Sequence, residues 1–358
     1  MINKLLTILL LAMILLGCGN NIENSPNSKI SSKPTGENLS ASPEAGDASV
    51  TDTGVERDSN PVEDNGLEPA IIDTSEPYVI LLVRFRRERQ TYLLYNMNGS
   101  FIAEIDLGNH FIYGPVPLSG DFILFGNFNG LSREGALVAT VEGITGELYP
   151  SLASRQYFPS IDDKGILYFQ NMENRREFFI SAPPYEEITH YELPIGEYPF
   201  HTISNVMIAL SGSRIATKLR SISEDPVLIV VDPQKDEIIF TQGIDDLENL
   251  HSLQGEYIFT RSYTSTNQYN IVSINEISEY PPGYSIYYLP NSELSVVQTG
   301  WDDHEPLFIG NIDEILKGRE LQLPSSSPNS KAFYGLLTTE IAQDLLDGEF
   351  VPVNILNY

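Results

Sequence analysis

Short apolar runs recur along about the last 290 residues of the chain, and turn-forming residues separate them. The runs Tyr92–Asn96 and Phe101–Ile105 flank Asn98-Gly99, a strong signal for a hairpin. Another pair of runs, Val227–Val231 and Glu237–Phe240, flanks a second turn. Tyr, Phe, Val and Ile dominate these runs, as they do in β-strands. The pattern predicts an all-β domain.

A turn followed by an apolar strand recurs with a glycine in most copies. Aligned on Gly120, Gly165, Gly212 and Gly255, the copies are spaced by 45, 47 and 43 residues. The next related turn, at Ser330, comes 75 residues later, which indicates an insertion or a degenerate extra unit. A period of about 40–50 residues with four short strands is typical of one β-propeller blade.

The clearest copy of the turn is Ser327-Pro328-Asn329-Ser330-Lys331, ahead of an apolar strand. It resembles the repeat of TolB-like and WD40-like propellers, in which a Ser-Pro-Asp-Gly turn and a basic residue precede a strand. The resemblance covers most of residues 69–358 and implies a single β-propeller. With a first copy at Thr74–Ile80, which lacks the glycine, we count six blades. Seven blades and a pair of β-sandwiches are the alternatives.

Ring closure and two helical turns are further expectations for this domain. Closure of the propeller should place the strand near Phe350–Leu356 beside the strand near Pro69–Asp73. Helical turns are expected at Asp313–Lys317 and at Ile341–Leu346, because a glycine closely follows each.

The N-terminus has the pattern of a processed export signal. Lys4 precedes Leu5–Leu16, an almost unbroken apolar run that is too short for a membrane span of about 20 residues. Gly17-Cys18 then completes a segment that resembles the lipobox of bacterial lipoproteins. The resemblance implies a signal peptide over residues 1–17 and a diacylated Cys18. A plain signal peptide with an incidental cysteine is the alternative.

Residues 18–68 are rich in Ser, Asn, Pro, Gly and acidic residues, a composition that favours a disordered tether. In Gram-negative lipoproteins, an Asp directly after the lipidated Cys favours the inner membrane. This chain has Gly19 there, which favours the outer membrane if the cell is Gram-negative. The net charge of −28 argues against nucleic-acid binding, which needs a basic surface.

No catalytic motif stands out, and no cofactor is expected. The sequence lacks a phosphate-binding loop and a His-Glu-x-x-His segment, and Gly283–Tyr287 lacks the second glycine of a nucleophile elbow. His201 and His251 lie at or just before strand starts, where they could face a central channel. Trp301–Glu305 contains three carboxylates and an imidazole, which could bind a divalent ion or form a solvated acidic loop.

Arginines mark one end of the predicted blades. In a TolB-like blade, the loops between the second and third strands lie on the same face as the connections between blades. The inferred loops or their borders hold Arg84, Arg86, Arg87, Arg89, Arg133, Arg175, Arg176, Arg220 and Arg261. Guanidinium groups bind carboxylate or phosphate in a bidentate fork, so the set predicts a binding face. Local pairing at strand ends, such as Arg176 with Glu177, is the alternative.

These observations favour a non-catalytic binding or scaffold protein of the cell envelope. It would be attached to a membrane by its lipid and would bind a protein or an anionic glycan through the arginine-bearing face. One alternative is a metal-dependent hydrolase or lyase that acts on an envelope carbohydrate or lactone in the propeller channel. Another is a scaffold that uses the outer edges of the blades.

Overall fold

The structure is a computed structural model that describes residues 71–85, 90–129, 132–152, 156–199, 201–273, 277–299, 307–316, 321–322 and 331–356. All of them fall in one compact unit, residues 65–358. Cys18 and the segment 18–68 lie outside the described residues. Within the described part, no helix is long and apolar enough to cross a membrane.

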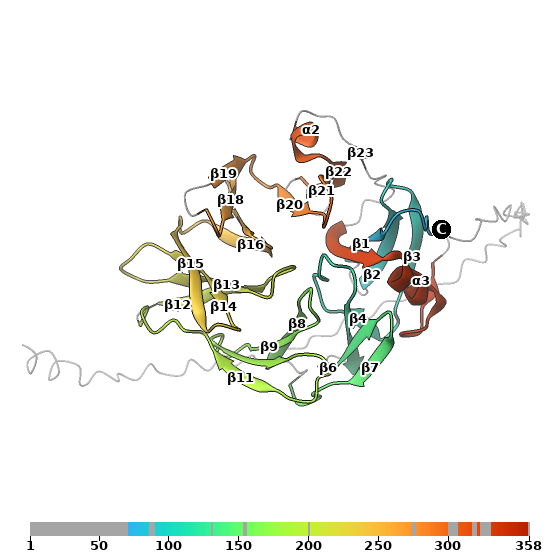
Figure 1. The fold of residues 1–358 in the computed structure, drawn as a ribbon, viewed down its shortest axis with the longest axis horizontal. Helices are drawn as coiled ribbons and strands as arrows, with labels where there is room; N and C mark the ends of the chain where they lie inside the picture. Colours follow the sequence, from blue (N-terminus) through green and yellow to red (C-terminus); the bar gives the residue numbers. More distant parts are fainter. Residues whose placement is uncertain are drawn as a thin grey trace, which may run out of the picture. The chain divides into compact units, whose positions relative to one another are not determined.

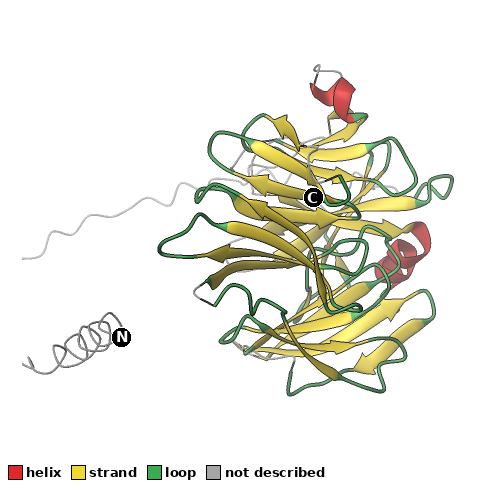
Figure 2. Ribbon diagram, turned by 60° about the vertical axis from the view of Figure 1, so that its left-hand side comes forward, coloured by secondary structure: helices red, strands yellow, loops and turns green. Residues whose placement is uncertain are grey.

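The described strands form six antiparallel sheets, which are arranged as the six blades of a β-propeller (Figure 1). This confirms the predicted all-β fold and the count of six. We letter the strands of a blade A to D from the innermost to the outermost. Figure 2 shows the sheets edge-on, packed beside one another, with the two described helices at their borders.

Blade 1 contains strands from both ends of the domain. Its order is β24 (Lys331–Thr338), β1 (Tyr78–Phe85), β2 (Gln90–Asn96), β3 (Phe101–Asp106) and β25 (Asn354–Ile355).

Blades 2 to 4 each take four consecutive strands. Blade 2 consists of β4 (His110–Ile112), β5 (Ile123–Asn129), β6 (Ser132–Thr140) and β7 (Gly143–Glu147). Blade 3 consists of β8 (Tyr157–Ile161), β9 (Leu167–Asn171), β10 (Glu177–Ser181) and β11 (Thr189–Glu192). Blade 4 consists of β12 (Thr202–Ile208), β13 (Ile215–Arg220), β14 (Val227–Asp232) and β15 (Glu237–Gly243).

Blades 5 and 6 follow the same rule. Blade 5 consists of β16 (Asn249–Gln254), β17 (Tyr257–Arg261), β18 (Thr266–Asn270) and β19 (Ile277–Tyr280). Blade 6 consists of β20 (Ser285–Tyr288), β21 (Ser295–Gln298), β22 (Leu307–Gly310) and β23 (Leu321–Gln322).

The ring closes differently from the prediction. The innermost strand of blade 1 is β24, which pairs with β1 from Tyr78↔Thr338 to Arg84↔Lys331. The expected pairing of Phe350–Leu356 with Pro69–Asp73 is wrong, because β25 pairs instead with β3 at the outer edge. The strand Lys331–Thr338 is longer and more apolar than the terminal segment, and its residues Phe333, Leu336 and Leu337 are buried, so it takes the central position.

The repeat assignment also needs one correction. The turns at Gly120, Gly165, Gly212 and Gly255 each lead into a B strand, whereas the strand after Ser330 is the A strand β24. The interval of 75 residues therefore includes a complete blade. Its A–B turn contains Asn291 in the left-handed conformation, with φ 56°, in place of a glycine.

Both predicted helical turns are present. Helix α2 spans Ile312–Leu316, and helix α3 spans Thr339–Asp347. The side chain of Thr338 caps the start of α3, and Gly348 ends the helix in the left-handed conformation with φ 74°. The apolar face of α3 packs into the core between blades 1 and 2.

The core consists of layers between neighbouring blades. All five residues of Val79–Val83 are buried, because each blade packs against another blade on both faces. Val79, Leu81 and Val83 belong to the layer shared with blade 2. Ile80 and Leu82 belong to the layer shared with blade 6. Successive side chains of a strand point to opposite faces, so the unbroken apolar run fills two layers.

The A–B end of the propeller is tightly connected from blade to blade. The loop between β4 and β5 crosses the ring, and the Leu118 amide donates to the carbonyl of Leu210 over 3.1 Å. Toward the neighbouring blade 1, the Val116 amide of the same loop donates to the Tyr334 carbonyl over 2.8 Å. The carboxylate of Asp163 accepts from the Gly212 amide, with both oxygens 3.0 Å away. These bonds link blades 1 to 4.

Candidate functional site

The opposite end of the propeller, which we call the B–C face, carries the loops between B and C strands and the linkers from each D strand to the next A strand. Antiparallel strand order places these two sets of connections together. Arg175 and Arg176 lie in the blade 3 loop, Arg220 ends β13, and Arg261 ends β17. The structure therefore places all four of these sequence-predicted residues on one face.

Arg175 and Arg176 border a surface pocket between blades 3 and 4. Its volume is about 290 Å³, and the segment from Met172 to Arg176 forms one wall. The Arg175 guanidinium donates to the Ser204 carbonyl over 2.9 Å, and Arg176 donates to the His201 carbonyl over 3.2 Å. Both contacts connect blade 3 to the start of blade 4. Arg175 is exposed, so its remaining donors face solvent.

Glu177 pairs with amide groups of its own blade and not with its neighbour Arg176, which was the alternative. Its carboxylate accepts from the side-chain amides of Asn171, over 3.0 Å, and Asn174, over 2.7 Å. The two amides fix the carboxylate against its own blade.

Arg220 and Lys218 hold the linker between blades 4 and 5. The Arg220 guanidinium donates to the Asp246 carbonyl over 3.0 Å, and its Nε lies 3.1 Å from a carboxylate oxygen of the same residue. Lys218 is fully buried, and its ammonium donates to the carbonyls of Asp245, Asp246 and Glu248. Burial lowers the pKa of Lys218. Arg220 therefore pairs locally at the end of its strand, as the alternative to a free guanidinium expected.

Arg261 is inserted between blades 5 and 6. It donates to the Gly283 carbonyl over 2.8 Å and to the Ser285 hydroxyl over 2.9 Å. Nearby, His251 of β16 lies 3.4 Å from the hydroxyl of Tyr287 on β20. The His251 ring keeps a small accessible surface, but burial, with a smaller contribution from Arg261, lowers its pKa to about 3. His251 is thus neutral at ordinary pH.

Several predicted residues are not placed. Arg86, Arg87 and Arg89 lie outside the described residues, as does the segment Trp301–Glu305. Arg133 lies in β6, and its side chain is not described.

Arg84, at the border of this set, is buried rather than on the face. It forms an ion pair with Glu104, which also accepts from the hydroxyl of Thr91. This pair lies within blade 1 and leaves little of either charged group to solvent.

His201, the other histidine that was expected to face the channel, lies just before β12. The residue is buried, and one ring nitrogen lies 3.5 Å from the exposed carboxylate of Glu224 in the blade 4 loop. Among the described residues, no group of three or more His, Cys, Asp or Glu side chains could hold a metal ion.

Exposed apolar side chains are the feature of the B–C face that the sequence interpretation missed. The loops of blades 2 to 5, as far as they are described, each carry one of them at the loop or at its border: Phe128, Met172, Ile222 and Tyr263. Ile222 is fully exposed, Tyr263 is 77% exposed, and Leu247 in the blade 4–5 linker is 62% exposed. Exposed apolar side chains also occur at the opposite end, for example Val141 and Val272, so what distinguishes the B–C face is that they recur beside arginines.

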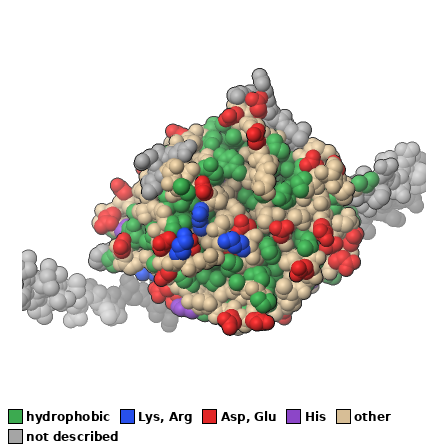
Figure 3. Space-filling model, viewed as in Figure 1, with side chains coloured by type: hydrophobic (Ala, Val, Ile, Leu, Met, Phe, Trp, Pro, Cys, Tyr) green, Lys and Arg blue, Asp and Glu red, His purple; other side chains and the backbone are tan. Residues whose placement is uncertain are grey.

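Acidic side chains are spread more widely over the surface seen in Figure 3 than basic ones. On the face seen in Figure 3, Asp and Glu side chains are spread toward the outline, and the few Lys and Arg side chains gather toward the middle. On the B–C face, Glu173, Glu224, Asp225 and Asp246 are exposed beside the arginines. The described part of this face therefore has mixed charge and is not uniformly basic.

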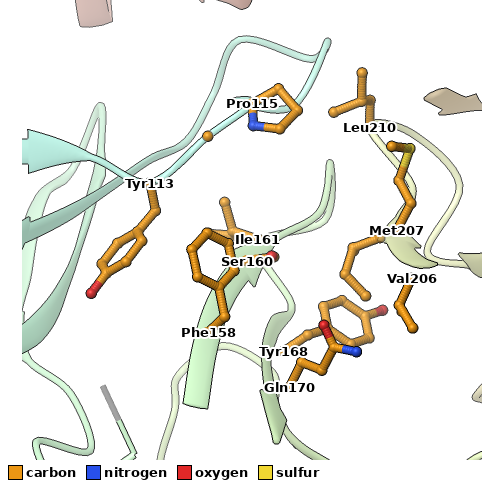
Figure 4. Close-up of a pocket in the computed structure, with 12 residues that line it drawn as sticks. Tyr113, Pro115, Phe158, Ser160, Ile161, Tyr168, Gln170, Val206, Met207 and Leu210 are labelled. Atoms are coloured by element: carbon orange, nitrogen blue, oxygen red, sulfur yellow. The ribbon is translucent and has the colours of Figure 1, made fainter. Parts of the chain in front are cut away.

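A second cavity lies inside the ring, between blades 2, 3 and 4 (Figure 4). Its volume is about 140 Å³. It is lined by side chains from β8, β9, β12 and the loop after β4, among them Phe158, Tyr168 and Met207. Ser160 and Gln170 add polar groups. No sequence motif marks this cavity, because its lining residues come from three repeats and each looks like an ordinary strand residue.

Comparison with known proteins identifies no family. No protein-family model matches the chain, and no curated protein matches it. Similar solved structures include TolB from Acinetobacter baumannii, at 11% identity and TM-score 0.42, covering 73% of this chain and 65% of that one.

Two further structures are similar at the same level. A chain of a nidogen/laminin complex has 8% identity and TM-score 0.44, covering 73% of this chain and 97% of its own. A chain of a mitotic checkpoint complex has 13% identity and TM-score 0.37, covering 76% and 85%. The fold of this protein follows from its own six sheets, and its function has to be argued from its own surface.

Proposed function

We propose that this protein is a non-catalytic binding module of the cell envelope, tethered to a membrane through lipidated Cys18, and that its B–C face binds a partner protein. The tether and the lipid rest on the lipobox-like segment and the composition of residues 18–68. The binding face rests on the geometry of the propeller.

One observation carries the choice of face. At each B–C loop from blade 3 to blade 5, an exposed large apolar side chain lies within four residues of an arginine: Met172 with Arg175, Ile222 with Arg220, and Tyr263 with Arg261. Aromatic residues, Met and Arg are enriched at the centres of protein interfaces. A repeated pairing of these types at one end of the ring fits a protein partner.

The arginine contacts favour a protein over an anionic glycan. Arg175, Arg176, Arg220 and Arg261 each use at least one donor on a backbone carbonyl of the same face. Their first role is to hold the loops and linkers in position, which pre-organises the surface and lowers the entropy lost on binding. An anionic polymer would instead need a face rich in unengaged cations.

The test compares two double variants with the same kind of change at opposite ends. Ile222→Ser with Tyr263→Ser removes apolar area from the B–C face. Val141→Ser with Val272→Ser removes it from exposed C–D turns at the A–B end. Loss of partner capture, in crosslinked pull-downs from intact envelopes, is expected for the first variant alone.

Either of two results would overturn the proposal. Equal capture by both variants would place the partner on the outer blade edges. Capture that survives in both and is abolished by digestion of envelope glycans would identify a glycan ligand instead.

A further inference from the structure

Rigid parts of the fold form the walls of the inner cavity, which is partly open to solvent. Phe158 and Ser160 alternate along β8, Tyr168 and Gln170 alternate along β9, and β12 closes the opposite wall with Met207. The loop after β4 covers it and is held to blade 4 by the hydrogen bond from Leu118 to Leu210. A cavity whose walls are paired strands exists before any ligand arrives.

No charged side chain lines the cavity. The nearby carboxylate of Asp162 is fully buried and already accepts from the hydroxyl of Tyr168, over 2.9 Å, and from the amides of Lys164 and Ile166. Burial raises the pKa of Tyr168 well above its usual range, so its hydroxyl stays protonated. An ion that entered would lose part of its hydration without finding a counter-charge, which disfavours charged ligands.

Two polar groups of the cavity come from blade 3. Ser160 lies on β8 and Gln170 lies on β9, whereas Pro115, Leu210 and Met207 come from the neighbouring blades and form an apolar border (Figure 4). The contact of Gln170 with protein is long, 3.4 Å from its nitrogen to the Arg175 carbonyl, so the amide remains able to bond elsewhere. This arrangement suits a compact apolar body with one polar end.

We propose that this cavity binds a small uncharged molecule with an aromatic or similarly compact body and a single hydroxyl or amide group. Its volume of about 140 Å³ is close to that of a protein cavity known to accept benzene, about 150 Å³. Tyr113 and Phe158 pack edge to face against each other, with ring centres 5.8 Å apart, and together form an aromatic wall against which a planar ring can pack. None of its lining residues belongs to the pocket at Arg175 and Arg176, and the proposal does not depend on the proposed function.

Ligand-observed NMR titration of the full chain with p-cresol tests the proposal. Saturable binding is expected. Benzoate and benzylamine, which carry a charged group attached to a similar ring, should bind at least tenfold more weakly than p-cresol. If p-cresol shows no saturable binding, or if a charged analogue binds as well as p-cresol, the proposal is wrong.

Two variants locate the binding. Ser160→Leu fills the cavity and should reduce p-cresol affinity at least tenfold, whereas Thr189→Leu introduces the same side chain on the exposed outer strand of the same blade and should have no effect. A circular dichroism melt would establish that both are folded. Unchanged p-cresol binding in folded Ser160→Leu would contradict the assignment.

Gln170→Met keeps the volume and removes the polar group. It should weaken p-cresol about fivefold and leave toluene unchanged, because a neutral hydrogen bond contributes about 1 kcal/mol. Equal losses for both probes would show that Gln170 does not bind the polar end, which would overturn the predicted ligand class.

Discussion

The two ends of the propeller use the same repeated turns for different purposes. At the A–B end, backbone groups of one turn bond to the next, and Leu118 and Leu210 fill the middle of the ring. At the B–C face, long polar side chains hold the loops, and apolar side chains such as Ile222 and Tyr263 point outward. One end stabilises the ring, and the other presents a surface.

The contrast shows how a repeat divides structural and functional roles. A–B turns pack closely on other parts of the ring, so they favour glycines with positive φ, such as Gly120 and Gly165, where an added Cβ would lie within 3 Å of Thr338 or Phe122. The described B–C loops carry exposed side chains such as Ile222 and Tyr263 instead. Changes at the two ends should therefore have very different effects on stability.

The largest effect is expected from Gly335→Val in β24. Gly335 has φ 141°, and an added Cβ would lie 2.1 Å from a methyl of Val116 and 2.8 Å from its carbonyl oxygen. Relief of this overlap requires the crossing loop to move away from the closing strand. We expect roughly 3 kcal/mol or more of lost unfolding free energy, measured by urea denaturation.

Gly143→Ala is the control for this change. Gly143 also has a positive φ, 112°, but nothing lies within 4 Å of an added Cβ. It reports the cost of backbone strain without the overlap. If the two variants lost the same free energy, close packing of the crossing loop on β24 would not be what stabilises the closure.

Leu118→Ala should cost about 2–5 kcal/mol, because Leu118 is buried where blades 1, 4 and 6 meet. Leu247→Ala, on the B–C face, should change the unfolding free energy by no more than about 0.5 kcal/mol. Chemical denaturation of the pair measures the comparison between the two ends. Similar losses of unfolding free energy would mean that the two ends contribute equally to stability.

Lys218→Met should cost roughly 3 kcal/mol. The substitution removes the donor to the carbonyls of Asp245, Asp246 and Glu248, and it leaves the Glu248 carbonyl buried without that partner. Lys235→Met is the matched control, since Lys235 is largely exposed and pairs with Asp232 on the surface. A neutral Lys218→Met variant would show that the linker is held by other contacts.

His251 gives a smaller effect that depends on pH. Its pKa is about 3 in the folded protein and about 6.5 when unfolded. Below pH 6.5 the unfolded chain therefore binds a proton that the folded protein does not, and stability falls until the pH reaches about 3. The native protein should lose more unfolding free energy between pH 8 and pH 4 than His251→Gln. Equal losses would mean that His251 titrates alike in both states.

The sequence predicted the architecture well, because strand alternation and the spacing of Gly120, Gly165, Gly212 and Gly255 report on local turns. It failed for ring closure, because which strand pairs with β1 depends on contacts more than 250 residues apart, as between Leu81 and Gly335. Local patterns contain no information on such a choice.

For the candidate site, the sequence located four arginines, Arg175, Arg176, Arg220 and Arg261, at B–C loops or their borders, but it did not give their partners. The bonds of Arg176 and Arg220 go to backbone carbonyls, which every residue has and no motif marks. The exposure of Ile222 could have been suspected from its flanking residues Ser221 and Ser223, since an isolated apolar residue in a polar loop has no strand to pack in. The inner cavity left no comparable signal.

Whether the B–C face is the partner-binding surface can be tested most directly by photo-crosslinking in intact cells. A photoreactive phenylalanine analogue would replace Ile222 or Tyr263 on the B–C face, and Val141 or Val272 at the other end. A crosslinked species of the same mass from positions 222 and 263, and none from 141 and 272, is the predicted result. Crosslinks that form equally from both ends, or from positions 141 and 272 alone, would contradict the account.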